Sequence, residues 1–249
     1  MKGAAIYFSG TGNTKYVVEL LVKEFQEKNI QCEMIDILKE KGVSKEYDFY
    51  VLASAIHVEV FPDIFVRWIK ENLPSVDNKR CIIVSTQASY IGYGGRQINK
   101  LLSNKGYDVM ITRSIPMPNN YYLSKFFKET PEDRKKEMKE DAVLEVKNIV
   151  DKFLKDEGYI EKQSALLTAV SKVAYKVSLK HFHKWPKKSL KVDYNRCTKC
   201  KRCVNECPTN NITFGDKIEF SDKCISCFRC VQKCPANAFL YKNRHFNQM

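Results

Sequence analysis

The sequence predicts an α/β domain built on a doubly wound, five-stranded parallel sheet, followed by a small α+β domain rich in cysteine. Two observations support this fold class. Apolar segments alternate with amphipathic segments over the first part of the chain, and strands separated by helices indicate right-handed crossovers and a parallel sheet covered on both faces. Eight of the ten cysteines lie between Cys197 and Cys234, which marks the second domain.

Five apolar segments are expected as strands because each is short and is followed by polar or turn-forming residues. These strands are residues 2–9, 31–37, 48–55, 80–87 and 107–115. The segments that follow four of them have apolar residues at helical spacing, as Val17, Leu21 and Phe25 do. The expected helices are residues 13–28, residues 62–73, a segment beginning near Gly94, and residues 131–155.

Residues 158–190 are predicted to be a helical connector between domains at residues 1–157 and 191–249. Its apolar residues recur at helical spacing and alternate with lysines. They include Leu166, Val170, Val173 and Val177, interleaved with Lys172, Lys176, Lys180 and Lys184. The sequence favours a helix that packs one domain on the other, and the alternative is a basic amphipathic helix on an anionic membrane. The pair Trp185-Pro186 is expected to end this helix.

The formal net charge of +13 is concentrated in the last third of the 249 residues, where residues 158–249 contribute +12. This suggests a partner with an acidic docking surface. Nucleic acid is disfavoured because no nucleic-acid motif is present and the basic residues accompany the cysteines. No apolar run reaches the roughly 18 residues of a membrane span. The N-terminus turns polar too early for a secretory signal, so a cytoplasmic location is predicted.

The cysteine-rich segment contains the pattern C-x2-C-x2-C-x3-C-P twice, 27 residues apart. The first copy has Cys197, Cys200, Cys203 and Cys207, and the second has Cys224, Cys227, Cys230 and Cys234. Structural zinc sites usually have two cysteine pairs separated by a longer loop. Three cysteines at steps of three instead suit a cubane, so the pattern favours iron–sulfur clusters over zinc.

This repeat resembles the bacterial two-cluster ferredoxins over residues 192–241. In that family the fourth cysteine of each copy ligates the cluster of the other copy. The resemblance therefore implies two [4Fe-4S] clusters. One would be held by Cys197, Cys200, Cys203 and Cys234, and the other by Cys224, Cys227, Cys230 and Cys207.

The first strand runs into the loop FSGTGNT at residues 8–14. The loop lacks the third glycine of a dinucleotide-binding fingerprint and lacks the Walker pattern. It has neutral donors around two glycines, in Ser9, Gly10, Thr11, Gly12, Asn13 and Thr14, and it leads into a helix N-terminus, which attracts anions. These features favour a single phosphate monoester, such as that of FMN, over a pyrophosphate.

The loop is similar to the flavodoxin phosphate loop, and the resemblance covers roughly residues 1–155. It implies the strand order 2-1-3-4-5, with the ligand at the carboxyl ends of the first and third strands. The flavin ring would then lie between the loops after the third and fourth strands. These loops contain Ser54, Ala55, Ile56, Gln87, Tyr90 and Gly92. Tyr90 either stacks on the ring or merely covers the loop, and no residue is assigned a catalytic role.

The whole chain resembles the flavodoxin–ferredoxin fusion proteins known as EFR-type ferredoxins of anaerobic bacteria. The resemblance implies a protein that passes electrons between two [4Fe-4S] clusters, an FMN and external redox proteins. Two alternatives stay open. One is a flavin-dependent reductase of a small acceptor, although no substrate-specific acid, base or second nucleotide-binding domain is visible. The other is an iron–sulfur redox sensor with a vestigial flavin site.

Overall fold

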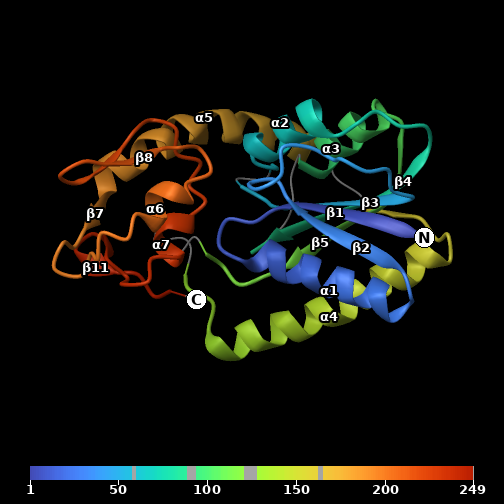
Figure 1. Cartoon of the computed structure of the whole chain (residues 1–249), viewed down its shortest axis with the longest axis horizontal. Coiled ribbons are helices and arrows are strands. Elements are labelled where there is room, and N and C mark those ends of the chain that lie inside the picture. The colour runs from blue at the N-terminus through green and yellow to red at the C-terminus, as the bar shows by residue number, and fades with distance from the viewer. Residues whose placement is uncertain (58–59, 89–93, 121–127, 162–164, 249) are drawn as a thin grey trace. The chain divides into compact units, whose positions relative to one another are not determined.

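The computed structural model describes residues 1–57, 60–88, 94–120, 128–161 and 165–248 (Figure 1). The chain divides into two compact units. The α/β unit comprises Met1–Asn119 and Glu129–Lys172, and the cysteine-rich unit comprises Asn120–Lys128 and Val173–Met249. The helix α5 (Ala165–Ser189) contributes residues to both units. The domain boundaries expected at residues 157 and 190 stay predictions.

A six-stranded parallel sheet with the order β2-β1-β3-β4-β5-β6 forms the centre of the α/β unit. The strands are β1 (Lys2–Phe8), β2 (Gln31–Asp36), β3 (Phe49–Ala55), β4 (Lys79–Gln87), β5 (Tyr107–Pro116) and β6 (Tyr159–Ile160). The first five have the order 2-1-3-4-5, which confirms the doubly wound fold class. The sixth strand was not expected, because two residues are too few to give a periodic signal. It extends the sheet by pairing Tyr159 with Ile111.

Four helices cover the two faces of this sheet, and all four were expected from the sequence. They are α1 (Asn13–Glu27), α2 (Asp63–Asn72), α3 (Gly94–Ser103) and α4 (Glu132–Leu154). Figure 1 shows α1 and α4 on one side of the sheet and α2 and α3 on the other. β1 and β3 are buried along almost their whole length, as parallel strands between two helical layers are.

Three aromatic rings anchor α1 and α4 to the sheet. The ring centroid of Phe49 on β3 lies 4.8 Å from that of Phe25 on α1 and 5.1 Å from that of Phe153 on α4. A Cβ atom at Gly3 would lie 2.1 Å from Cζ of Phe49. β1 therefore passes beside this ring only because residue 3 has no side chain.

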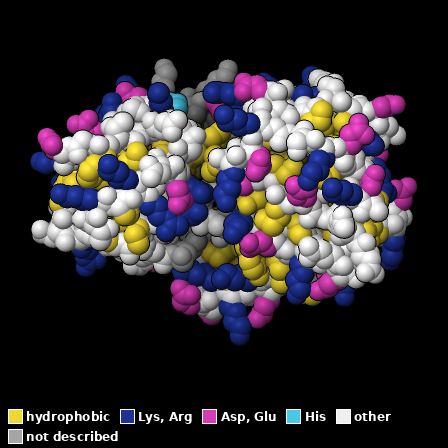
Figure 2. Space-filling view, viewed as in Figure 1, with side chains coloured by type: hydrophobic (Ala, Val, Ile, Leu, Met, Phe, Trp, Pro, Cys, Tyr) yellow, Lys and Arg dark blue, Asp and Glu magenta, His cyan; other side chains and the backbone are white. Residues whose placement is uncertain are grey.

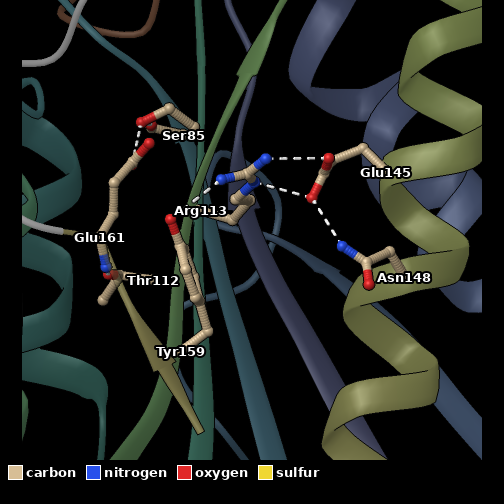
Figure 3. A network of polar contacts seen from close by, with 8 residues as sticks. Ser85, Thr112, Arg113, Glu145, Asn148, Tyr159 and Glu161 are labelled. Carbon is tan, nitrogen blue, oxygen red and sulfur yellow. Dashed lines mark hydrogen bonds and ion pairs between the residues drawn. The ribbon is translucent and has the colours of Figure 1, made fainter.

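Polar contacts tie β5 to α4 and β6 (Figure 3). The guanidinium of Arg113 on β5 donates from Nε to Oε1 of Glu145 on α4 at 2.7 Å and from Nη2 to Oε2 at 3.0 Å, a bidentate and therefore strong geometry. The same guanidinium lies 5.3 Å from the ring centroid of Tyr159. Beyond β6, the carboxylate of Glu161 accepts a hydrogen bond from Ser114 at 2.5 Å. These contacts fix where the chain leaves the sheet.

The cysteine-rich unit is a small α+β structure, as predicted. A sheet of order β11-β10-β7 and the antiparallel hairpin β8-β9 are joined by two four-residue helices. The elements are β7 (Leu190–Val192), α6 (Arg202–Asn205), β8 (Ile212–Phe214), β9 (Ile218–Phe220), α7 (Arg229–Gln232), β10 (Phe239–Tyr241) and β11 (Arg244–His245). The apolar cluster described in this unit is small and includes Phe228, Val231 and Phe239, and so small a core gives limited stability.

The expectation that Trp185-Pro186 ends the connector helix was wrong. α5 continues through Pro186 to Ser189. The indole of Trp185 is buried, with its ring centroid 5.4 Å from that of Phe228 and 5.8 Å from that of Tyr241. This packing holds the last turn of α5 on the core and outweighs the local preference of proline to terminate a helix.

The surface carries both signs of charge. On the face shown in Figure 2, Lys and Arg side chains alternate with Asp and Glu, and hydrophobic side chains are exposed in small areas between them. Among the described residues, no helix combines the length and the apolar character needed to cross a membrane.

We predict that Gly106→Ala destabilises the chain by about 2 kcal/mol or more. Gly106 has φ +86°, and a Cβ atom there would lie 1.7 Å from the backbone oxygen of Val76. Chemical denaturation followed by circular dichroism measures the change. Gly42→Ala is the matched control, because no atom lies within 4 Å of its added Cβ, and equal losses in both variants would contradict the prediction.

Candidate functional site

The loop after β1 leads into α1 through Gly12, which has φ +133°. Side chains rarely adopt this conformation, so glycine suits the position. A Cβ atom on Gly12 would meet no atom within 4 Å, which leaves open space beside the helix N-terminus. The N-cap residue Gly12 has no side chain to cap α1, and the first turn contains no acidic residue. The amide groups and dipole of α1 therefore favour an anion at this end.

Three of the residues that were predicted to bind a phosphate form hydrogen bonds to other protein atoms, and these bonds hold the loop in place. The Thr14 hydroxyl is hydrogen-bonded to that of Thr86 at 2.7 Å, and the Asn13 amide donates to the carbonyl of Pro118 at 2.9 Å. The hydroxyl of Ser9 accepts from the backbone N–H of Lys15 at 3.3 Å. Thr14, Ser9 and Gly10 are buried, whereas Thr11, Gly12 and Asn13 are partly exposed.

The predicted ring contacts after β3 lie at the same edge of the sheet. The backbone N–H of Ile56 donates to the carbonyl of Thr86 at 3.0 Å and joins the end of β3 to β4. Ser54 is fully buried, and its hydroxyl donates to the carbonyl of Ala55 at 3.1 Å. Ser54 therefore supports the edge from within, while Ala55 and Ile56 are partly exposed there.

At the end of β4, the side-chain oxygen of Gln87 accepts from the hydroxyl of Ser85 at 3.1 Å, and its carbonyl accepts from the N–H of Met117 at 2.8 Å. Tyr90 and Gly92, the other predicted ring contacts, lie outside the described residues. Sequence reasoning did not identify Thr86 or the contact of Pro118, whose hydrogen bonds to Thr14 and Asn13 join the loop at residues 8–14 to β4 and to the segment after β5. The position of Thr86 at the end of a predicted strand was the one available signal.

The eight clustered cysteines line two separate cavities in the cysteine-rich unit. Cys197, Cys200, Cys203 and Cys234 line the first cavity, together with residues such as Phe214 and Phe239. Cys207, Cys224, Cys227 and Cys230 line the second, together with residues such as Trp185 and Phe220. Each cavity takes three cysteines from one repeat and the fourth from the other. Within the described ranges, no three Cys, His, Asp or Glu side chains converge as ligands of one metal ion.

The backbone of the two repeats is as regular as their sequence. Lys199, Lys201 and Asn210 have φ values of 56°, 56° and 49°, and the residues 27 positions later, Ser226, Phe228 and Asn237, have 53°, 57° and 44°. This left-handed conformation costs non-glycine residues free energy. It turns the chain sharply between successive cysteines, so three of them face one cavity. Ligand binding in the cavities would offset this cost.

Backbone N–H groups donate to the sulfurs of several of these cysteines. The N–H of Asn211 lies 3.2 Å from Sγ of Cys207, and the N–H of Ala238 lies 3.3 Å from Sγ of Cys234. These two contacts are equivalent in the repeats and involve the two fourth cysteines. The N–H of Ser226 contacts Sγ of Cys224 at 3.3 Å. Hydrogen bonds to ligand sulfurs stabilise negative charge on them and raise cluster potentials.

The electrostatic environment of the thiols differs between positions. Burial raises the pKa of Cys203 and of Cys224 to about 11 each, and the pKa of Cys227 to about 12. At the exposed Cys200, a hydrogen bond from the backbone N–H of Arg202 lowers the thiol pKa. A bound metal ion supplies the positive charge that buried thiolates need.

The basic residues expected around the clusters form two groups. Arg202, Arg229 and Lys233 surround Glu206, with nitrogen–oxygen distances of 2.7, 3.2 and 3.4 Å. Burial tends to raise the pKa of Glu206, but the Arg202 hydrogen bond and the charges of Lys233 and Arg229 lower it overall. A second group, Lys199, Lys201 and Lys223, is exposed.

Residues 189–235 match the family model of the 4Fe-4S dicluster domain. No curated protein sequence matched the chain. An archaeal flavodoxin structure is 18% identical, covers 61% of this chain and 99% of its own, and gives a TM-score of 0.41. The structure of oxidised Flavodoxin 1 from Bacillus cereus is 20% identical in sequence and gives a TM-score of 0.44. The match covers 61% of this chain and 98% of the Bacillus cereus chain. By its own strand order and this family match, the chain joins a flavodoxin-like α/β fold to a segment similar to the 4Fe-4S dicluster domains.

Proposed function

We propose that this chain is an electron-transfer protein that holds one FMN and two [4Fe-4S] clusters and exchanges electrons with external redox proteins. The observation that carries the proposal is the division of eight cysteines between two cavities, four in each. A redox role agrees with the match of residues 189–235 to the 4Fe-4S dicluster domain.

The cluster assignment follows the cavity walls. Cys197, Cys200, Cys203 and Cys234 would hold one cluster, and Cys207, Cys224, Cys227 and Cys230 the other. Four thiolates per site match the ligand set of a cubane. The amide groups that donate to Cys207 and Cys234 would hold these two sulfurs in place and tune the potentials of both sites in the same direction.

The FMN assignment depends on the carboxyl edge of the sheet. The order of β2, β1 and β3 reverses at β1, and ligands of doubly wound sheets bind at such switch points. The loop at residues 9–14 would bind the phosphate through the N-terminus of α1, with Thr11, Gly12 and Asn13 partly exposed around it. Thr86 and Pro118 would keep the loop in shape through their hydrogen bonds to Thr14 and Asn13.

The residues of the two units have different tasks in this function. A bound flavin supplies the ability to couple two-electron and one-electron chemistry. The cysteines hold the one-electron carriers, and the tether between the units makes exchange between the two sites intramolecular. The exposed lysines 199, 201 and 223 would attract a partner with an acidic docking surface and speed its encounter.

Anaerobically purified protein is predicted to contain about eight iron atoms and one FMN per chain. Two double variants test the crossed ligand sets. Cys197→Ala with Cys234→Ala should remove one cluster and leave about four iron atoms, because both residues line one cavity. Cys197→Ala with Cys207→Ala should remove both clusters, because these residues line different cavities. Iron and sulfide analysis measures the outcome.

The control for this pair is Cys32→Ala, which changes a buried cysteine of β2 far from the repeats in sequence and should retain all the iron. The opposite order of iron loss in the two double variants would mean that each repeat holds its own cluster. Zinc in place of iron in oxygen-free protein would refute the cluster assignment.

Gly12→Ala is predicted to weaken FMN binding about tenfold or more. The reason is that side chains rarely adopt the φ of +133° found at residue 12, so alanine would strain the loop. A strain of about 1.4 kcal/mol corresponds to a tenfold loss of affinity. Flavin fluorescence quenching measures the affinity. Riboflavin, which lacks the phosphate, should bind the variant and the native chain equally. A matching loss for riboflavin would show that the loop does not bind the phosphate. Gly215→Ala, in open space, is the control.

The same preparations separate electron transfer from the other two functions. Fast oxidation or reduction by a ferredoxin, with no turnover of small acceptors, is the expected behaviour. Steady oxidation of NAD(P)H without a protein partner would instead indicate a flavin-dependent reductase. Full clusters in protein that has no affinity for FMN would indicate an iron–sulfur sensor.

A further inference from the structure

α5 presents an apolar stripe to the solvent. Leu166, Val170, Val173 and Val177 are 75%, 60%, 64% and 68% exposed. Their spacing of four, three and four residues places them on one face of the helix. Because α5 is one continuous helix, their alignment depends on the helix alone. The sequence favoured a helix that packs one domain on the other. These four side chains are nevertheless exposed.

The charge of α5 is of one sign. The helix contains six lysines and no Asp or Glu between Ala165 and Ser189. Lys172, Lys176 and Lys180 recur every four residues along the sequence of the helix. Towards the C-terminal end, Lys184, Lys187 and Lys188 are exposed, and Lys187 forms an ion pair with Asp222 at 3.1 Å. A surface that covers the stripe must therefore tolerate or attract a dense positive charge.

This combination argues against a second copy of the chain as the occupant. Two α5 helices packed through their stripes would bring twelve lysines together without a compensating acidic residue from either helix, and such like-charge contacts are costly. An acidic protein is a weaker match as well. Protein interfaces are depleted in lysine, and their energetic centres are enriched in Trp, Tyr and Arg, whereas this stripe is formed by Leu and Val.

We propose that α5 lies on an anionic lipid surface, with Leu166, Val170, Val173 and Val177 in the boundary between headgroups and acyl chains. Interfacial helices have an apolar face, lysine-rich flanks and a low overall hydropathy. Anionic headgroups attract such clustered basic residues. The described part of the chain contains no membrane-spanning helix, so α5 binds along the surface. This inference goes beyond the proposed electron-transfer function and does not depend on either cofactor.

The test uses the full-length protein and two kinds of vesicle. One is pure phosphatidylcholine, and the other is phosphatidylcholine and phosphatidylglycerol in equal amounts. The protein should sediment with the anionic vesicles and stay in solution with the neutral ones. Added salt should weaken the binding, because it screens the attraction. Failure to bind the anionic vesicles at low salt would overturn the proposal.

The variant Val173→Glu with Val177→Glu should bind the anionic vesicles about tenfold less or weaker still, because it removes apolar area from the stripe. Both positions are exposed, and Glu has a higher helix propensity than Val, so folding should be preserved. The matched control is Val143→Glu with Leu144→Glu. These residues are 46% and 68% exposed on α4, and the control adds the same charge. Equal losses in variant and control would overturn the proposal.

Hydrogen exchange on the native chain provides a measurement that needs no variant. Anionic vesicles should slow exchange at residues 166–177, and neutral vesicles should not. Slower exchange at other sites only, or a change of oligomeric state in the Val173→Glu/Val177→Glu variant without vesicles, would overturn the proposal. The second result would assign the stripe to a contact between copies of the chain.

Discussion

Each cysteine cavity depends on a side chain from the other repeat. Cys234 lies with the first three cysteines of repeat one, and Cys207 lies with the first three of repeat two. Neither set of four is complete until both repeats have folded against each other. The apolar cluster described in this unit is small, and several residues between the cysteines adopt the costly left-handed conformation. Binding of the two proposed clusters would therefore stabilise this unit, as metal binding does in other small domains.

The α/β unit differs from the cysteine-rich unit in its apolar packing. Its sheet is covered on both faces, and the aromatic contacts of Phe25, Phe49 and Phe153 close one of them. The cluster around these rings contains many more buried apolar residues than the cluster described in the cysteine-rich unit. Hydrogen bonds from Thr14 to Thr86 and from Asn13 to Pro118 hold the loop after β1 against the neighbouring strand ends. A preorganised loop loses little conformational entropy when it binds an anion, so a rigid scaffold serves the proposed phosphate site.

α5 contributes residues to both units. Its exposed Leu and Val residues are not among the residues described as packing with Trp185, whose ring contacts secure the end of the helix. The proposed binding to an anionic surface would place the redox unit near partners that are themselves confined to a membrane. Confinement to one surface raises the effective concentration of two partners.

The sequence by itself determined the order of the strands and helices along the chain, the spacing of the cysteines and the position of the glycine loop. These are local patterns, because apolar periodicity and residue spacing act over one or two turns or strands. Residue spacing could not indicate that Cys234 leaves its own repeat, and only the likeness to two-cluster ferredoxins implied it. Spacing also gave no sign of β6, of the Thr86 and Pro118 contacts, or of a helix that continues through Pro186. Only the tertiary structure decided these features, since each depends on residues that are distant in the chain and meet through packing and long-range hydrogen bonds.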